Sequence, residues 1–305
     1  MEHREWIRQK AVELGFGYCG FAKAESLDNL AELYHLYLEQ NRTNALPYLE
    51  RYAPQRLNPD ILFPGVRTVI AVLMNYYPHY LIPETDNFII AKYAYGKDHH
   101  VVVKERLHLL TYFITDSLPG SRVRAFFDSG PVLEKVWAQR CGIGWQGKNT
   151  VIINPSAGSF IHIGILLTTL ELESDMPHKD HCGKCRRCID ACPTQALETP
   201  GRIRIDRCIA YHTIESKEPI PRVLMGTFKG RIFGCDICQN VCPFNRFAKP
   251  HREPAFDPSD ELVGMRKKEW LHLTEERFQR LFRESCIARA GYHRLKRNIM
   301  FQAQF

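Results

Sequence analysis

The sequence predicts an α+β protein in which a mixed α/β domain precedes a compact cysteine-rich module and a helical tail. Helical and strand-like apolar patterns mix through the first part of the chain, and eight of its eleven cysteines fall between Cys182 and Cys242. A chain of 305 residues is long enough for more than one domain. We therefore expect divisions at residues 1–175, 176–250 and 251–305.

The first part shows two helical patterns and four strand-like runs. Apolar residues recur at the helical period over Arg4 to Leu14 and over Leu27 to Leu38. Short apolar runs bounded by glycine, proline and serine turns predict strands. These strands are Thr68 to Met74, Arg122 to Phe127, Val151 to Asn154 and Ser159 to Thr168.

The tail is predicted to end in a helix that begins at Thr274, whose hydroxyl can cap the N-terminus. Its apolar stripe would be Phe278, Leu281, Phe282 and Cys286. Between residues 264 and 305 there are ten Lys or Arg against four Glu, so this segment carries +6 of the net charge of +7. That balance suits a polyanion such as RNA, with Lys296 and Arg297 as phosphate contacts, although a solvated helix face would give the same pattern.

Composition also excludes some classes of protein. No apolar run approaches the ~20 residues that a membrane-spanning helix needs. The N-terminus begins with charged residues at helical spacing and shows no apolar export signal. We therefore expect a cytoplasmic protein without membrane association. In a reducing cytoplasm, eleven cysteines indicate metal or redox chemistry rather than disulfides.

The first cysteine run has a specific spacing. Cys182, Cys185, Cys188 and Cys192, followed by Pro193, match the C-x2-C-x2-C-x3-C-P run with which two-cluster ferredoxins hold 4Fe-4S clusters. The short spacings let the first three thiolates converge on one cluster, while the fourth ligates the other cluster. This interpretation requires a second set of ligands elsewhere in the chain.

A second, incomplete run supplies that set. Cys235, Cys238 and Cys242 precede Pro243, and Cys208 is the natural replacement for the missing first cysteine. The predicted crossed assignment places one cluster on Cys182, Cys185, Cys188 and Cys242, and the other on Cys192, Cys208, Cys235 and Cys238. Two zinc sites are the alternative, but zinc sites rarely use such runs. The remaining cysteines, Cys19, Cys141 and Cys286, are predicted to be small buried hydrophobes.

Asp128 is the candidate functional acid of the first domain. It follows an apolar strand and precedes Ser129, Gly130 and Pro131, so its carboxyl group would lie at a strand end where a turn opens into a helix. The alternative is a structural N-cap for a helix beginning near Pro131. A G-x-G-x-x-G pattern at 142–147 follows a helical segment rather than a strand, which disfavours a dinucleotide site.

Taken together, the motifs resemble one known family. They are KYAYGKDHH at 92–100, FFDSGPVLEK at 126–135, GIGWQGKNT at 142–150, AGSF at 157–160 and MGTFKGRIFGCDICQNVCPFN at 225–245. In this order, with the first cysteine run, they resemble the epoxyqueuosine reductases, cobalamin-dependent iron-sulfur enzymes of tRNA queuosine synthesis. The resemblance implies a cobalamin-binding catalytic domain, a double 4Fe-4S ferredoxin-like module and a basic helical tail.

The resemblance also implies roles for individual residues. Asp128 would be the proton donor facing the cofactor, with a raised pKa that lets it protonate the departing epoxide oxygen. Asp98, His99 and His100 would lie on the substrate side, the alternative being an exposed loop. The cobalamin environment would include Arg51, Asp128, Lys148, Ser159 and Tyr211.

The family implies a tRNA substrate, an external electron donor and a monomer. Many longer members carry a C-terminal helical-repeat extension that this chain lacks, which leaves the tRNA to the basic tail and the cluster module. Two alternatives stay open. One is a reductive dehalogenase or another cobalamin-dependent small-molecule reductase, and the other is a ferredoxin-like electron relay without catalysis of its own.

Overall fold

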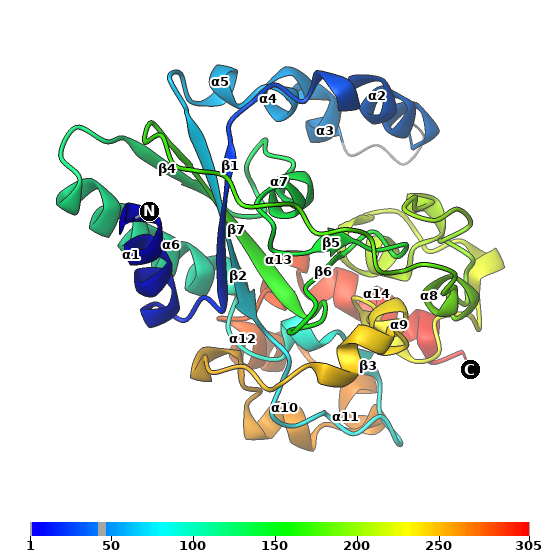
Figure 1. Cartoon of the computed structure of the whole chain (residues 1–305). Coiled ribbons are helices and arrows are strands. Elements are labelled where there is room, and N and C mark those ends of the chain that lie inside the picture. Colours follow the sequence, from blue (N-terminus) through cyan, green and yellow to red (C-terminus); the bar gives the residue numbers. More distant parts are fainter. Residues whose placement is uncertain (1, 42–46, 305) are drawn as a thin grey trace.

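A four-stranded antiparallel sheet forms the centre of the N-terminal part of the protein (Figure 1). The computed structural model describes residues 2–41 and 47–304. The strand order is β1-β2-β7-β4. The strands are β1 (Tyr18–Lys23), β2 (Thr68–Asn75), β7 (Ile161–Thr168) and β4 (Val123–Phe126).

Helices cover both faces of this sheet, as Figure 1 shows. One face packs on α1 (Glu2–Glu13) and α6 (His99–Ser117), and the other on α7 (Glu134–Arg140). Along β2, Ile70, Val72 and Met74 belong to the first core, whereas Val69, Ala71 and Leu73 belong to the second. Successive side chains of a strand point to opposite faces, so a strand covered on both faces is apolar throughout. This explains why the sequence showed β2 so clearly.

The predicted elements of this domain are confirmed in outline. The first predicted helix is α1, and the second begins a few residues later than expected, as α2 (Ala31–Gln40) after a 3-10 turn. The predicted strand at 151–154 is only the two-residue β6 (Ile152–Ile153), which pairs with β5 (Trp145–Gln146) outside the central sheet. The sequence analysis did not predict α6, whose first turn contains His99, His100 and valines with modest helix propensity.

Short elements lie between β1 and β2 and within the cysteine-rich module. After α2 come α3 (Pro47–Arg51), α4 (Ala53–Leu57) and α5 (Pro59–Leu62). In the module, α8 (Arg187–Asp190) and α9 (Ile237–Asn240) each belong to one cysteine run and pack against each other. A five-residue π-helical turn, η5 (Tyr211–Glu215), lies between the runs. Two short parallel strands, β3 (Ile89–Ile90) and β8 (Arg231–Phe233), join the module to the N-terminal part.

The tail is helical, as predicted, but it has no core of its own. Its helices are α10 (Asp260–Gly264), α11 (Lys267–Leu271), α12 (Glu275–Phe282), α13 (Ile287–Ala290) and α14 (Tyr292–Gln302). Buried Trp270, Phe278 and Phe282 share one apolar cluster with Phe88 and Ile232. The three-part division by residue number stays a prediction, and the packing of the tail crosses it.

The predicted final helix is α12. Thr274 caps it, because its Oγ1 accepts a hydrogen bond of 3.2 Å from the backbone N–H of Arg277. The helix ends at Phe282, and Cys286 lies at the start of α13 instead of extending the stripe. The sequence analysis missed α14, the actual last helix.

The two basic residues expected to bind phosphate are used inside the protein. Lys296 Nζ donates hydrogen bonds to the backbone carbonyls of Leu271 (2.6 Å) and Leu273 (3.3 Å). The Arg297 guanidinium donates to the carbonyls of His212 (2.6 Å), Ser216 (2.9 Å) and Glu218 (2.5 Å). Their charges therefore stabilise helix and turn ends of this chain. No helix within residues 2–41 and 47–304 has the length and apolarity to cross a membrane.

Candidate active site

The eight clustered cysteines lie together as free thiols, each only partly accessible. Burial, followed by the charges of Cys182 and Cys185, raises the pKa of Cys242. Burial and then Cys235 and Cys208 raise the pKa of Cys238. Burial also raises the pKa of Cys208, with Cys192 as the cysteine contributing to it. The largest cysteine contributions follow the two crossed sets that the spacing predicts, although Cys188 of the first set also acts on Cys238 and ligation itself stays a prediction.

Two predicted cobalamin residues contact the cysteine-rich module instead. Lys148 Nζ donates to the backbone carbonyls of Gly183 (2.6 Å) and Cys185 (2.9 Å), so it fixes the first cysteine run against the loop before β6. Ser159 is 3 % exposed, and its Oγ accepts hydrogen bonds from Asn245 Nδ2 (2.9 Å) and Gln239 Nε2 (3.2 Å). Both side chains are thus engaged in holding the second run to the sheet domain.

Steric constraints explain the glycine of the AGSF motif, which lies in the same network. Gly158 has φ +74°, a left-handed backbone conformation, and a Cβ atom there would collide with Asn245 Oδ1. Only glycine satisfies both conditions without strain. The motif therefore fits the close approach of the two parts of the molecule.

Asp128 lies at the end of β4, as predicted, in a left-handed conformation with φ 55°. Its backbone N–H donates a 2.6 Å hydrogen bond to Glu134 Oε1, which supports this conformation. The N-cap alternative is wrong, because α7 begins at Glu134 and Leu133 occupies the cap position. The carboxyl group of Asp128 therefore does not cap α7.

Asp128 instead contacts His100, at the start of α6. His100 Nε2 lies 2.6 Å from Asp128 Oδ2, and His100 Nδ1 lies 2.9 Å from Asp98 Oδ1. Asp98 caps α6 by accepting a hydrogen bond of 2.9 Å from the backbone N–H of His100. His99 and His100 are 8 % and 9 % exposed, so the alternative of an exposed loop is wrong. The structure thus links Asp98, His100 and Asp128, and Arg289 Nη1 also lies within hydrogen-bond distance of the His100 ring, 2.8 Å from Nε2.

The electrostatics of this arrangement overturn one expectation. The hydrogen bond from His100 lowers the pKa of Asp128, and this outweighs the effect of burial, whereas a raised value was expected. Burial alone would lower the pKa of His100, but its hydrogen bonds to Asp128 and Asp98 raise it. Burial alone would raise the pKa of Asp98, but the hydrogen bonds from His100 outweigh burial and lower this pKa to about 2. Between the lowered pKa of Asp128 and the raised pKa of His100, the pair therefore holds its proton on the imidazole.

Asp128 lies in a partly enclosed region together with Glu134, Lys135 and Tyr48, and we call this region the Asp128 hollow. The Asp128 side chain keeps 57 % of its accessible surface, and Lys135 is also exposed. Yet burial, followed by the charge of Asp128, raises the pKa of Glu134 to about 8, and burial lowers the pKa of Lys135. Solvent thus reaches part of this region, while burial still shifts the pKa values of the groups in it.

The Asp128 hollow extends toward the second cysteine set. The charges of Cys238 and Cys208 act on the pKa of Lys135, against the larger effect of burial. On another wall, burial raises the pKa of Tyr48, with further contributions from Glu215 and Asp128. The sequence analysis named neither Lys135 nor Tyr48. No sequence signal singled them out, because each is brought to the hollow by the fold.

The other two residues predicted to lie near cobalamin are Arg51 and Tyr211. Arg51 is exposed at the end of α3, the helix that also carries Tyr48. Tyr211 begins η5, and burial, followed by the charges of Glu215 and Glu218, raises its pKa. Lys148 and Ser159 contact the cysteine-rich module, and a role toward cobalamin stays a prediction for all four residues.

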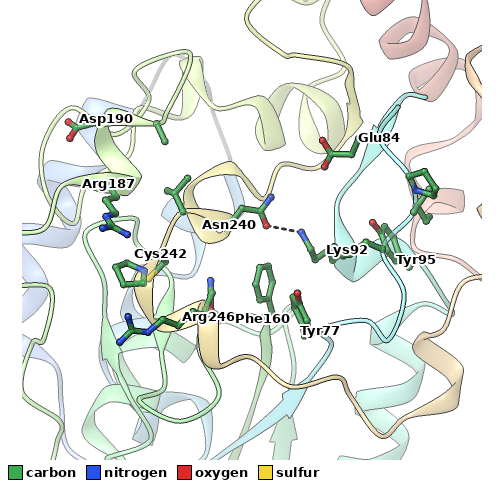
Figure 2. A pocket seen from close by; sticks show the side chains of 17 residues that line it. Tyr77, Glu84, Lys92, Tyr95, Phe160, Arg187, Asp190, Asn240, Cys242 and Arg246 are labelled. Atoms are coloured by element: carbon green, nitrogen blue, oxygen red, sulfur yellow. Dashed lines mark hydrogen bonds between the residues drawn. The ribbon is translucent and has the colours of Figure 1, made fainter. Parts of the chain in front are cut away.

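A separate pocket of about 1060 Å³ lies on the cysteine-rich module (Figure 2). Cys242, Arg187 and Arg246 line it on the module side, and Lys92 on the other. Lys92 Nζ donates a 2.7 Å hydrogen bond to Asn240 Oδ1 across the gap, as Figure 2 shows. Asp128 is not among the lining residues. This pocket thus reaches the first cysteine set from outside and is distinct from the Asp128 hollow.

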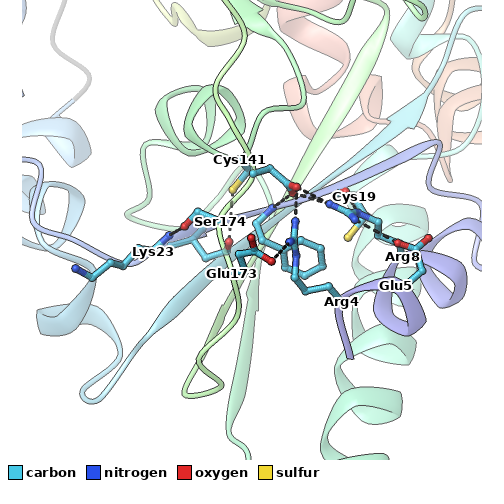
Figure 3. A network of polar contacts seen from close by, with 11 residues as sticks. Arg4, Glu5, Arg8, Cys19, Lys23, Cys141, Glu173 and Ser174 are labelled. Carbon is cyan, nitrogen blue, oxygen red and sulfur yellow. Dashed lines mark hydrogen bonds and ion pairs between the residues drawn. The ribbon is translucent and has the colours of Figure 1, made fainter. Parts of the chain in front are cut away.

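The three remaining cysteines lie away from both cysteine sets. Cys141 and Cys286 are buried, as predicted, and burial raises the pKa of Cys19 to about 12. Cys19 lies within a polar network around Asp175, in which Arg8 Nη2 donates to Asp175 Oδ1 (2.6 Å) and the Phe21 N–H donates to Oδ2 (2.9 Å) (Figure 3). This network fastens α1 and β1 to the segment that leads into the cysteine-rich module.

Two family models match this chain. Residues 181–245 match the model described as 4Fe-4S double cluster binding domain. Residues 56–129 match the model described as Epoxyqueuosine reductase QueG, DUF1730. The first match contains all eight clustered cysteines, and the second ends one residue after Asp128.

Whole-chain comparisons agree with these matches. The chain is 42 % identical to epoxyqueuosine reductase of Cellulophaga algicola over 300 residues, covering 98 % of each chain. It is 37 % identical to epoxyqueuosine reductase of Pseudomonas aeruginosa over 302 residues, covering 97 % of this chain and 82 % of that one.

Solved structures of the same name are similar throughout. One is a crystal structure of epoxyqueuosine reductase with an epoxyqueuosine-modified tRNA-Tyr stem loop; it has a TM-score of 0.88 and 29 % identity and covers 99 % of this chain and 80 % of that one. Another, from Bacillus subtilis, has its catalytic aspartate loop swung out of the active site; it has a TM-score of 0.87 and 29 % identity and covers 99 % and 81 %.

Proposed function

Because this chain belongs to the epoxyqueuosine reductase family, we propose that it converts epoxyqueuosine to queuosine at the wobble position of tRNA anticodons. The chain is thus an oxidoreductase with a tRNA substrate. Opening of the epoxide to the alkene consumes two electrons and two protons and releases the oxygen as water. The protein must therefore deliver both electrons and protons to one place, and the Asp128 hollow has neighbours suited to each task.

The cysteine-rich module supplies the electron path. It is a double 4Fe-4S cluster binding domain, and its eight thiols satisfy two clusters of four ligands each. We assign Cys182, Cys185, Cys188 and Cys242 to the first cluster, and Cys192, Cys208, Cys235 and Cys238 to the second. The second set is the one whose charges reach Lys135, so it would be the cluster nearest the reaction.

The Asp128 hollow fits a bound cobalamin. Asp128 is accessible there, and the charges of Cys208 and Cys238 of the second cysteine set act on Lys135. Arg51 and Tyr211 lie on α3 and η5, the elements that also carry Tyr48 and Glu215. A bound cobalamin would supply a reducible cobalt centre for two-electron chemistry. Cationic Arg51 and Lys135 suit polar groups at the rim of the corrin. Lys148 and Ser159, with their hydrogen bonds satisfied elsewhere, are left out of this assignment.

Asp128 and His100 would handle the proton. The imidazolium holds the proton on Nε2, 2.6 Å from Asp128 Oδ2, while Asp98 fixes the ring through Nδ1. Asp128 presents its accessible carboxyl group to the hollow, where it can pass a proton to the departing oxygen and regain one from His100. The low pKa of Asp128 therefore does not disqualify it, because the pair acts as one donor.

The substrate and donor surfaces are also proposed. Since Lys296 and Arg297 serve internal contacts, we expect tRNA to meet the rim of the Asp128 hollow, where Lys104 Nζ donates a 3.1 Å hydrogen bond to Ser129 Oγ. The external electron donor would approach the pocket that Cys242 lines, because that pocket reaches the first cysteine set from outside. We propose that the protein works as a cytoplasmic monomer.

The testing experiment is a combined analysis of metal content and activity. Protein purified without oxygen and incubated with cobalamin should contain about eight irons and one cobalt. With a strong reductant, it should convert epoxyqueuosine in tRNA to queuosine. The observation that carries the proposal is the position of Asp128 between a protonated His100 and a hollow facing the second cysteine set. Eight irons with cobalt but no tRNA product, together with reduction of small halogenated compounds, would favour the reductase alternative.

A further inference from the structure

A second group of polar side chains lies outside the candidate active site, beyond the C-terminal end of β2. His79 follows β2, and His251 and Asp257 flank the short turn at Pro254–Phe256. Their potential ligand atoms all lie within 4.8 Å of one another. We propose that His79, His251 and Asp257 bind a divalent transition-metal ion of the zinc class, independent of the iron-sulfur clusters and beyond the proposed reductase chemistry.

Backbone contacts hold this group in place. The His251 N–H donates a 2.8 Å hydrogen bond to the Tyr77 carbonyl, two residues before His79. Asn75 Nδ2, at the end of β2, donates a hydrogen bond of 2.7 Å to the carbonyl of Lys249. Two segments far apart in the sequence therefore lie in fixed register. A preorganised backbone of this kind reduces the conformational entropy lost when side chains converge on an ion.

His251 is the observation that points to a ligand. Its side chain is 1 % exposed, and within residues 2–41 and 47–304 neither ring nitrogen has a hydrogen-bond partner. A buried imidazole with both nitrogens unsatisfied is unfavourable, and such groups in native proteins usually mark a missing partner. A metal ion bound to Nε2 would give that nitrogen a partner. Nε2 already faces Asp257, which could bind the same ion.

The spacing suits tetrahedral coordination. His251 Nε2 and Asp257 Oδ1 are 3.5 Å apart, and the rings of His79 and His251 are 5.1 Å apart at 86°. Ligand atoms about 2.0–2.1 Å from a tetrahedral zinc ion lie about 3.4 Å from one another. Two imidazoles and one carboxylate are borderline ligands that suit zinc and similar ions, and a water molecule would complete the shell.

The other group with ligand-like spacing differs in its hydrogen bonds, although His99 Nδ1 there also has no hydrogen-bond partner among the described residues. Asp98, His99 and His100 also lie within 4.8 Å of one another. There, however, the nitrogens of His100 already contact Asp98 Oδ1 and Asp128 Oδ2. A metal ion would break the contacts that define the proton path. The contrast between the two groups therefore favours His251 as the metal site.

An ion at this position would fasten the 249–257 segment to the exit of β2. The His251 ring packs edge-on against Phe256 at 5.7 Å, and Phe256 packs against His162 at 5.6 Å. His162 in turn stacks on His99 at 4.6 Å, beside His100. The ion would thus stiffen the wall behind the proton-carrying histidine without contacting the reacting groups.

The test measures zinc binding to the cluster-loaded chain, kept without oxygen and without cobalamin. Equilibrium dialysis against Zn²⁺, with elemental analysis, should give one zinc per chain while iron stays at about eight, so that the cluster cysteines are not the zinc ligands. His251→Ala and Asp257→Asn should each weaken zinc binding by at least about tenfold. His293→Ala, at an exposed histidine on α14, should bind zinc as the unaltered chain does.

Thermal unfolding provides the second readout. Zinc should raise the Tm of the unaltered chain and of His293→Ala, but not that of Asp257→Asn, whose exposed side chain can change without loss of the fold. The proposal is overturned if the cluster-loaded chain takes up no zinc. It is also overturned if Asp257→Asn and His251→Ala bind zinc as tightly as His293→Ala does. Neither result depends on tRNA reduction, so the proposed function is judged separately.

Discussion

The cysteine-rich module and the Asp128 hollow are built in opposite ways. In the module, seven of the eight thiols come from two short runs, each spanning about ten residues with a fixed spacing. The hollow combines Tyr48, His100, Asp128 and Lys135, which come from α3, α6, the turn after β4 and α7. The difference shows that a multi-metal cluster can be recognised from local spacing, whereas a proton-transfer site depends on tertiary contacts.

The crossed ligand sets are the sharpest point of that comparison. Cys192→Ala should abolish the second cluster, reduce iron from about eight to about four per chain, and stop turnover, because a cubane normally needs four ligands. Its sequence neighbours Cys185 and Cys188 should keep their cluster. Iron analysis and spectroscopy of the reduced protein check this. Cys286→Ala, at a buried cysteine outside both sets, is the matched control and should retain all iron. Loss of the first cluster's signal instead would contradict the crossing.

Asp128 should be indispensable for turnover but not for assembly. Asp128→Asn keeps the size and removes the acid, so single-turnover rates should fall by about 10²–10⁴, the usual contribution of a general acid. Iron and corrinoid content should be unchanged. Asp116→Asn, at an exposed aspartate on α6, should react at the normal rate. Unchanged turnover in Asp128→Asn would remove Asp128 from the proposed proton path.

His100 should set the alkaline limit of the reaction. Its pKa is raised, so its proton is present below the folded-state pKa and is lost as pH rises through that value. Turnover should therefore decline on the alkaline side, and His100→Gln should lower the rate and flatten that decline. The same sign holds for stability, since the contribution of the imidazolium is present below its unfolded pKa near 6.5 and is lost as pH rises through the higher folded value. A rate profile in His100→Gln parallel to that of the unaltered protein would contradict this role.

Glu134 should have the smallest effect. Because its pKa is raised to about 8, its neutral form is favoured in the folded state, and this contribution to stability is lost as pH rises from its unfolded value to about 8. Glu134→Gln keeps an acceptor for the Asp128 N–H and cannot ionise, so the gain in Tm over the unaltered chain should be larger at pH 9 than at pH 6. Calorimetry at the two pH values checks this. A loss of stability at pH 9 would show that the ionised carboxylate is the favoured form.

The sequence by itself determined several features with physical reasons that are local. Both-sided burial made β2 apolar throughout, the C-x2-C-x2-C-x3-C-P spacing indicated two clusters, and Thr274 marked a helix start through its hydroxyl. The position of Asp128 after a strand was visible for the same reason. Each of these depends on a few neighbouring residues, and such patterns are legible without knowledge of the fold.

Only the tertiary structure decided what those residues do. The pKa of Asp128 is lowered rather than raised because His100, from a helix that the sequence did not reveal, lies 2.6 Å away. Lys296 and Arg297 are taken up by carbonyl groups from turns and helix ends distant in sequence, and Ser159 by Asn245. Partners distant in sequence determine the protonation, burial and hydrogen bonds of these side chains. No local sequence pattern specifies which partners will meet. The chemistry of the thiols was therefore predictable from the sequence, while that of the proton path was not.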